Sequence, residues 1–495
     1  MNLLFGSAKD NNQTVSLNNH YIHSPYSPIK EAERFVSLLS SVECDLILLI
    51  EPGLPYTLPF LKKKYPSARI GIIRLIKDLN AYNSDWDFVF EYKNAQALEN
   101  TLLSTFTEEE LLCSQLLDWT PSKNLFQVEN LQIWQSYKKV LEHCRTILVT
   151  RQYFEKKWII NTCNYIKYLT NDYSIINKSS KPILIISSGP SLNNVIKELS
   201  QFQEKCFIIC LSSAIKVLLS KNIKPDLILT TDGGYYAGQH LKQLFNSETP
   251  IIAAPCEAFI QKQLLEKLNI IPCTYSDGIS KKMLEACNIN AITLERNGTV
   301  SGTALKLALQ LTDNNIYCLG MDLAPGKASQ HTEPNELEIN NSIKDFRINN
   351  KETRQTKARF NSQSLSIYRN WFENQSGLKN KIFRVIENQE KLGEIENINY
   401  SDFINLMIST NDSFQDKSIF KEQKDYSDND RIQKIKSLKL FIENNSSSEE
   451  WKKQIFPVDF ISIKHAKNQE EKELLLQNLE EKNQKLLNKI GKLLN

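Results

Sequence analysis

Six short apolar runs recur between residues 182 and 323, and this repetition restricts the fold more than any other feature. The runs are ILIIS, FIICL, DLILTT, PIIAA, AITL and IYCLG. Amphipathic or mixed stretches of roughly helix length separate them, as repeated strand–helix units require. The pattern predicts an α/β fold with a central, doubly wound, mainly parallel Rossmann-like sheet. Such a sheet binds ligands outside the carboxyl ends of its strands.

The 495 residues exceed what one ordinary core can hold, and the pattern divides them into four parts. Alternating apolar runs predict a small α/β domain at 1–105, and an aromatic-rich helical pattern predicts a bridge at 106–180. The predicted sheet lies in a central domain, 181–400. A mainly helical domain, 401–495, completes the chain.

The last predicted helix carries apolar residues at alternating spacings of three and four, with one asparagine among them. Such a seam predicts either a short coiled coil that forms a homodimer or packing onto the chain's own domain, and the spacing does not separate the two. The positions are Leu476, Leu479, Asn483, Leu486, Ile490 and Leu493.

Composition excludes several classes of protein. The 60 basic residues nearly balance the 57 acidic ones, so no strong field favours nucleic acid or an anionic membrane. No apolar run approaches a bilayer span, and the amino terminus does not resemble a secretory signal. Cys206, Cys210 and Cys318 lie within or beside apolar runs, as buried thiols do in reducing compartments. We expect a cytoplasmic protein without a transmembrane segment.

A turn of small residues follows the first predicted strand of the central sheet. In ILIISSGPSLNNVIKEL the strand ends at Ile186, and a tight turn through Gly189 and Pro190 places Ser191 at a helix N-cap. Free N–H groups and the positive helix end favour an anion there. The alternative is an ordinary strand-to-helix turn.

A second turn repeats this arrangement in RNGTVSGTALKLALQL. Asn297 and Gly298 form the turn, and Ser301 and Gly302 begin a helix with apolar residues on its inner face. Two helix N-termini in one parallel domain predict a phosphate held from two sides. Two well-made turns without a ligand remain the alternative.

Two aspartates and a histidine complete the set of candidate residues. Asp232 in IKPDLILTTDGG and Asp322 in IYCLGMDLAPG follow predicted strand ends, where ligand contacts are expected. Asp232 suits a ribose, a base or a metal. His331, in the loop after Asp322, can take a proton from an attacking hydroxyl, although a lone loop histidine is more often only solvated.

At these positions the sequence resembles the motility-associated factor (Maf) family of flagellin glycosyltransferases, whose central domain is similar to bacterial sialyltransferases. The resemblance covers most of the chain. It is carried by HSPYSPIKEAERF (residues 23–35), SSGPSL, AIKVLLSKNIKPDLILTTD, NGTVSGTALKLALQL and IYCLGMDLA. The family's amino-terminal turn is richer in glycine than EPGLPY (residues 51–56), which weakens the case for a nucleotide site in the first domain.

The resemblance implies transfer of a nonulosonic acid, of the pseudaminic or legionaminic type, from its CMP derivative to Ser or Thr of flagellin, with inversion. It implies His331 as the catalytic base. No DxD-like acidic pair is evident in the sequence, so we expect no metal and no obligatory cofactor. The resemblance assigns the nucleotide sugar to Gly189, Pro190, Ser191, Ser213, Asp232, Asn297, Ser301, Gly302 and Asp322.

Two other functions remain open. The same central segment resembles 6-hydroxymethylpterin diphosphokinases of the MptE-like group, which implies use of Asp232 and Asp322 with Mg²⁺ and ATP. A non-catalytic flagellin-binding motility factor with a vestigial sugar site is the other. The small-residue turns argue against it weakly.

Overall fold

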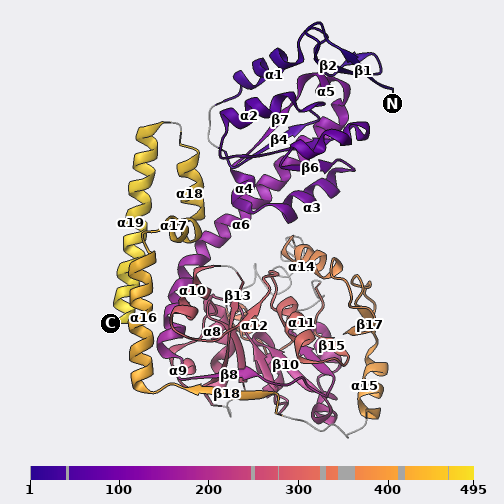
Figure 1. Cartoon of the computed structure of the whole chain (residues 1–495). Helices are drawn as coiled ribbons and strands as arrows, with labels where there is room; N and C mark the ends of the chain where they lie inside the picture. The colour runs from indigo at the N-terminus through magenta and orange to yellow at the C-terminus, as the bar shows by residue number, and fades with distance from the viewer. Residues whose placement is uncertain are drawn as a thin grey trace. The chain divides into compact units, whose positions relative to one another are not determined.

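The computed structural model describes residues 2–40, 44–246, 251–276, 278–323, 331–343, 363–410, 418–466 and 468–495. The chain forms two compact units (Figure 1). The first comprises residues 1–155 and 448–485, and the second comprises 156–447 and 486–495. Helices α6 (Gln127–Tyr168) and α19 (Gln469–Leu494) contribute residues to both units.

The described part of the second unit is built on a nine-stranded sheet in which every pairing is parallel. The doubly wound parallel sheet predicted from the apolar runs is therefore confirmed, and two more strands extend it beyond residue 330. Its order is β14-β13-β12-β11-β10-β9-β15-β16-β17. The strands are β9 (Ile183–Ile186), β10 (Phe207–Leu211), β11 (Leu227–Leu229), β12 (Ile251–Pro255), β13 (Asn269–Tyr275), β14 (Ile292–Leu294), β15 (Ile316–Leu319), β16 (Ile382–Val385) and β17 (Glu396–Ile398).

The strand order reverses between β9 and β15. The chain builds outward from β9 through β10 to β14, and then returns to place β15 on the other side of β9. Loops leave the carboxyl ends of β9 and β15 toward opposite faces at such a reversal, which opens a crevice for a ligand.

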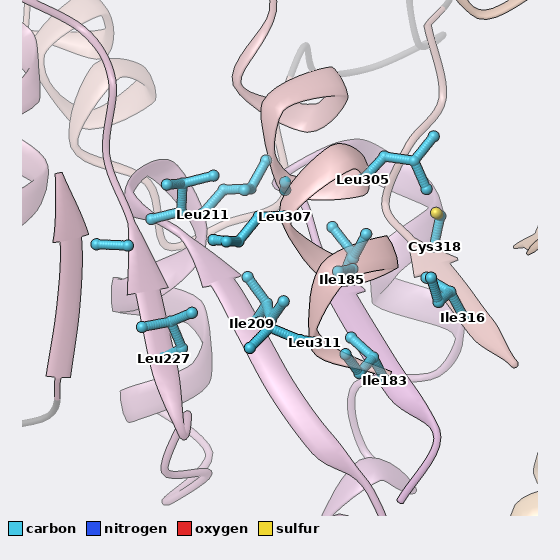
Figure 2. Close-up of a cluster of buried hydrophobic side chains, with 14 of the residues drawn as sticks. Ile183, Ile185, Ile209, Leu211, Leu227, Leu305, Leu307, Leu311, Ile316 and Cys318 are labelled. Atoms are coloured by element: carbon cyan, nitrogen blue, oxygen red, sulfur yellow. The ribbon is translucent and has the colours of Figure 1, made fainter. Parts of the chain in front are cut away.

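Helix α11 (Val300–Leu311) shows why this sheet is stable. Leu307 and Leu311 are fully buried, and Figure 2 shows them beside Ile183, Ile185 and Ile209 of strands β9 and β10. The inward face predicted from the helical spacing is confirmed. Burying such side chains stabilises the fold by roughly 1.5–3 kcal/mol each, so this contact also fixes the start of α11 at the carboxyl edge of the sheet.

Further helices and one pair of strands from distant parts of the chain belong to the second unit. Strands β8 (Asn171–Ile175) and β18 (Phe420–Asp425) pair antiparallel. The helices are α7 (Ile215–Leu219), α8 (Tyr235–Leu241), α9 (Lys262–Leu265), α10 (Ile279–Ala286), α12 (Glu336–Ser342), α14 (Gln363–Glu373), α15 (Tyr400–Ser409) and α16 (Asp428–Asn445).

The first unit has its own parallel sheet, with β4 (Leu46–Ile50), β5 (Arg69–Arg74), β6 (Phe88–Glu91) and β7 (Ser114–Asp118) in the order β6-β5-β4-β7. Three short antiparallel strands precede it: β1 (Leu3–Ser7), β2 (Gln13–Leu17) and β3 (His20–Tyr21). The helices are α1 (Pro28–Ser37), α2 (Leu58–Lys64), α3 (Ala95–Thr105), α4 (Glu108–Leu112), α5 (Thr120–Leu125), α17 (Glu449–Ile455) and α18 (Pro457–Lys464).

These units divide the chain differently from the four predicted domains. Strand β7 pairs with β4, so the first sheet extends past the boundary expected at residue 105. The predicted helical bridge, 106–180, contains β7 and β8 besides α6. Pairing between strands that are distant in the sequence decides to which unit a segment belongs. Such pairing leaves no periodic pattern in the sequence of residues 106–180.

The apolar seam of α19 packs within the chain. Leu479, Leu486 and Ile490 are buried, whereas Leu476 is 46% exposed. Asn483 Oδ1 accepts a hydrogen bond of 2.9 Å from Trp451 Nε1. Asn483 therefore provides a hydrogen-bond partner for a buried indole of the same chain. This contact fits packing of the helix onto its own chain, the second of the two alternatives predicted for it.

All ten cysteines are buried thiols, as the apolar runs around Cys206, Cys210 and Cys318 predicted. Among the helices of the described ranges, none combines the length and the apolar character needed to cross a bilayer.

Candidate functional site

Asp322 holds the turn that follows β9. Its Oδ2 accepts hydrogen bonds from the Ser191 N–H (3.1 Å) and the Ser191 hydroxyl (3.0 Å). Gly189 N–H donates to Gly320 O at 2.9 Å, and a Cβ on Gly189 would lie 2.0 Å from Asp322 Oδ2. The loops that follow β9 and β15 are thus joined at the switch point. The Asp322 carboxylate accepts the hydrogen bond that the Ser191 N–H would otherwise donate to a phosphate.

The helix predicted after Gly189 does not form. Residues Pro190–Asn194 make a 3-10 turn with Gly189 as its N-cap, so Ser191 is not the N-cap of an α-helix. Two asparagines followed by β-branched Val195 and Ile196 have low helix propensity. The apolar residues of this stretch are nevertheless buried in the core. The prediction that this turn supplies an α-helix dipole was wrong.

A row of hydroxyl groups lines the same edge. Ser187 Oγ lies 3.2 Å from Ser301 Oγ, which brings the turn after β9 beside the start of α11 although the two are 114 residues apart. Ser188 Oγ donates to Ser213 Oγ at 2.9 Å, linking the end of β9 to the segment after β10. The structure therefore brings together Gly189, Ser191, Ser213, Ser301 and Asp322.

The start of α11 keeps its helix-end N–H groups free of an N-cap side chain. Thr299 is the N-cap and makes no side-chain cap bond. Asn297 Oδ1 instead accepts from the Thr299 N–H at 3.1 Å, and Asn297 Nδ2 donates to Thr303 Oγ1 at 3.3 Å. A Cβ on Gly302 would lie 2.8 Å from Asn297 Oδ1. Asn297 thus shapes the turn, and the helix end remains suited to an anion.

Arg384 on β16 adds a buried cation that the sequence pattern did not single out. It is fully buried; its Nη2 donates to Glu390 O at 2.7 Å, and its Nε donates to Asn397 Oδ1 at 3.2 Å. Nη1 has no partner among the described residues. Burial lowers the pKa of Arg384, and nearby Arg369 lowers it further, while Asp322 opposes both.

Burial raises the pKa of Asp322, and the two hydrogen bonds from Ser191 and the charge of Arg384 oppose that rise. The partly buried carboxylate is therefore electrostatically supported but not exposed to solvent like a typical magnesium ligand. Within the described ranges, no group of three or more His, Cys, Asp or Glu side chains is placed to hold a metal ion.

His331 is anchored over the turn after β9. The neighbouring Thr332 N–H donates to Ser188 O at 2.7 Å, and Thr332 Oγ1 donates to Gly189 O at 2.6 Å. His331 Nδ1 lies 3.4 Å from Oε1 of the buried Glu338. The His331 side chain is 27% exposed. It is therefore not a freely solvated loop residue, and a carboxylate at Nδ1 leaves Nε2 to accept a proton.

A second histidine lies near His331. Burial lowers the pKa of His240 on α8, and His331 lowers it further, whereas Asp232 and Glu336 act in the opposite direction. His240 is neutral near pH 7 and could also act as a base. Glu336 in turn is 2.5 Å from Lys216 Nζ. No sequence motif marked His240, because it lies within a seven-residue helix.

Asp232 lies three residues beyond β11 and is exposed. Its Oδ1 accepts from the Gly234 N–H at 2.8 Å, so it turns the chain into α8. Arg296, beside the predicted Asn297, lies 4.0 Å from the Tyr275 ring centroid and 3.6 Å from Glu257 Oε1. This edge thus offers a carboxylate and a stacked guanidinium. The hydrogen bonds given above do not connect Asp232 or Arg296 with the contact between Ser191 and Asp322.

Three known proteins or families are similar to this chain. Residues 156–327 match the protein family described as 6-hydroxymethylpterin diphosphokinase MptE-like. An uncharacterised protein of Treponema pallidum (strain Nichols) is 26% identical over 325 residues, which are 65% of this chain and 71% of that protein. The solved Maf glycosyltransferase from Magnetospirillum magneticum AMB-1 has a TM-score of 0.50 and 13% identity, covering 96% of this chain and 81% of that one. The chain shares the Maf glycosyltransferase fold.

The MptE-like segment, residues 156–327, contains β9 to β15 and hence both sides of the switch point. Most of the predicted site residues lie within it, including Ser191, Ser301 and Asp322. His331 lies just beyond it, and Arg384 lies well outside. The shared Maf fold spans nearly the whole chain and so includes both.

Proposed function

We propose that the chain is a cytoplasmic glycosyltransferase that moves a nonulosonic acid from a CMP-sugar to Ser or Thr hydroxyls of flagellin, with inversion and without an obligatory metal. The observation that carries the proposal is the convergence of Ser187, Ser188, Ser213 and Ser301 at the switch point of the sheet. The shared fold with a Maf glycosyltransferase supports the same reaction class.

The leaving group decides what such a site must provide. When the sugar–phosphate bond breaks, CMP departs with the bonding electron pair, and the phosphate gains negative charge. The N–H groups at the start of α11 and the serine hydroxyls supply preorganised donors for that charge. Because Asp322 already holds the Ser191 N–H, we assign the phosphate to the α11 side.

The acceptor hydroxyl must lose a proton as it attacks the anomeric carbon. In the proposed step, His331 Nε2 takes that proton, the new carbon–oxygen bond forms, and CMP leaves on the opposite face. Glu338 orients the ring through Nδ1 and stabilises the imidazolium. Attack opposite the leaving group accounts for inversion.

The match of residues 156–327 to MptE-like proteins favours a second candidate, an ATP-dependent pterin diphosphokinase. Asp232 and Asp322 would then hold Mg²⁺. Asp232 is exposed and suits this role, but Asp322 directs one oxygen to Ser191. Because Ser191 holds Oδ2, Asp322 would have to bind Mg²⁺ through Oδ1.

Ligand binding and product mass separate the candidates. Thermal-shift measurements on the full chain should give stabilisation by CMP that does not depend on Mg²⁺. Stabilisation by ATP with Mg²⁺ and by hydroxymethylpterin, but not by CMP, would favour the pterin reaction. Intact-mass spectrometry of flagellin co-expressed with the chain and a CMP-sugar pathway should show added nonulosonic acid, and unmodified flagellin would contradict the transfer proposal.

A further inference from the structure

A large open groove lies in the first unit. It has a volume of about 1200 Å³ and is lined by β3, α1 and the segment that follows β7. None of the residues assigned to sugar transfer lines it.

The groove follows the length of α1. Lys30, Glu31, Arg34, Phe35 and Leu38 all line it, at spacings that place them along one side of the helix. From Lys30 to Leu38 the helical rise is about 12 Å. Five residues that follow β7 also line it: Trp119, Thr120, Pro121, Asn124 and Leu125. A lining that follows a helix over more than two turns suits a segment of chain better than a compact nucleotide.

The volume points the same way. Small-molecule sites usually enclose about 300–1000 Å³ and bury most of their ligand. This groove is larger, and its rim is open: the side chains of Tyr21, Tyr26 and Leu38 are 53%, 63% and 78% exposed. Exposed aromatic and apolar groups beside a cation are typical anchors for a protein partner.

The charges of the groove are mainly positive. Lys30 and Arg34 are exposed on successive turns of α1, and neither makes an ion pair within the described ranges. The carboxylate among the lining residues, Glu31, accepts a hydrogen bond of 2.8 Å from the Ser24 N–H. Burial raises the pKa of Glu31. At the rim, Lys9 Nζ lies 4.4 Å from the Tyr26 ring centroid, next to Asp10.

From this shape and charge we infer that the groove docks an acidic peptide segment of a partner protein, with an aromatic or aliphatic side chain of that segment packed against Phe35 and Leu38. Lys30 and Arg34 pair with its carboxylates. The inference is independent of the sugar-transfer reaction and concerns only the first unit.

Fluorescence anisotropy on the full chain tests this docking. The probe is a labelled 12-residue peptide of Asp and Glu with two Phe residues, compared with the same peptide carrying Lys in place of the acids. We expect the acidic peptide to bind more tightly at low salt, and the double variant Lys30→Glu, Arg34→Glu to weaken it by about 10-fold or more, since two attractive pairs become repulsive.

The matched control is Lys63→Glu, an exposed lysine on α2 outside the groove lining, which should leave binding unchanged. Equal thermal unfolding of the three proteins shows that the fold is kept. Equal binding of the acidic and basic peptides, or no loss in the double variant, would overturn the inference. So would displacement of the peptide by CMP or inorganic phosphate, because the groove would then be a small-anion site. Unchanged CMP binding by the double variant separates this test from that of the transferase site.

Discussion

The two parallel sheets of this chain differ in the polar groups at the carboxyl ends of their strands. In the first unit, strand-end carboxylates are satisfied by the unit itself: Glu51, after β4, pairs with Arg74 Nη1 at 2.7 Å and accepts from the Leu75 and Ile76 N–H groups. In the second unit, the edge between β9 and β15 holds several serine hydroxyls and an uncapped helix end.

The same contrast holds at the neighbouring strands. Burial would raise the pKa of Asp118, the last residue of β7, but hydrogen bonds from Lys123, Trp134 and Asn130 outweigh it and hold the pKa below its usual value. The edge of the first sheet is thus closed by internal bonds, and we expect no nucleotide there. Topology alone does not make a ligand site: donors that remain available at the strand ends are also required.

The largest effect is expected at the edge between β9 and β15, where donors remain available and which we call the open edge. If His331 is the base, His331→Ala should lower the rate of sugar transfer by about 10²- to 10⁴-fold while CMP binding stays intact. Glycan transfer to co-expressed flagellin, followed by intact mass, measures it. His143→Ala on α6 is the control. Loss in His240→Ala but not in His331→Ala would move the base to the second histidine.

At the carboxyl edge of the first sheet, a substitution should lower the free energy of unfolding rather than the rate of transfer. Arg74→Leu leaves Glu51 charged, buried and without its ion-pair partner, which costs about 3–5 kcal/mol. Urea unfolding, or hydrogen exchange of the β4 and β5 amides, measures the loss. Lys62→Leu removes an exposed pair with Asp87 and should cost about 1 kcal/mol or less. Similar costs for both variants would mean that the buried pair does not close this edge.

A smaller effect is expected where the two loops of the open edge touch. Gly189→Ala places a Cβ against Asp322 and Gly320, and overpacking of this kind costs about 1–3 kcal/mol. If CMP binding must overcome the same free energy, the affinity for CMP falls by about 5- to 150-fold. Isothermal titration checks this, with Gly491→Ala on α19, which meets no atom within 4 Å, as the control. Unchanged CMP affinity would mean that the turn after β9 does not shape the CMP site.

The smallest effect concerns pH at the closed edge. Burial lowers the pKa of His23 from 6.5 to about 3. Its Nε2 accepts a hydrogen bond from the Leu54 N–H. A depressed histidine pKa stabilises the fold above 6.5, and that stability is lost as pH falls toward 3. The loss is about 1 kcal/mol over the first pH unit below 6.5. His23→Gln should flatten the unfolding curve over this range; His20→Gln should not. Parallel curves for wild type and His23→Gln would refute the burial effect.

The sequence was informative where local periodicity determines structure. Leu307 and Leu311 marked the inner face of α11, and the apolar runs marked β9 to β15. Asp322 could be placed at a strand end for the same reason. Which loops meet was not predictable in detail, because the contact of Ser188 with Ser213 depends on neighbouring strands in the final order.

Long-range pairing explains what sequence reasoning missed. Arg384 lies on a four-residue strand beyond the regular alternation, and only its pairing with β15 brings it near Asp322. The split of the chain into interleaved units likewise depends on contacts between distant segments. The prediction of a helix after Gly189 failed because burial of Leu192 and Leu199 at helical spacing is also compatible with 3-10 turns.

The interleaving of the two units has a consequence for synthesis on the ribosome. Asp45 pairs with Lys464, 419 residues further along the chain, and Lys167 Nζ reaches Leu493 O at 2.5 Å. Domains usually fold in the order in which they emerge. Here the amino-terminal sheet can form early, but its α17 and α18 contacts must wait until the second unit has been translated. Groups of the nascent first unit such as Asp45 and Gln152 therefore remain without these partners through most of translation.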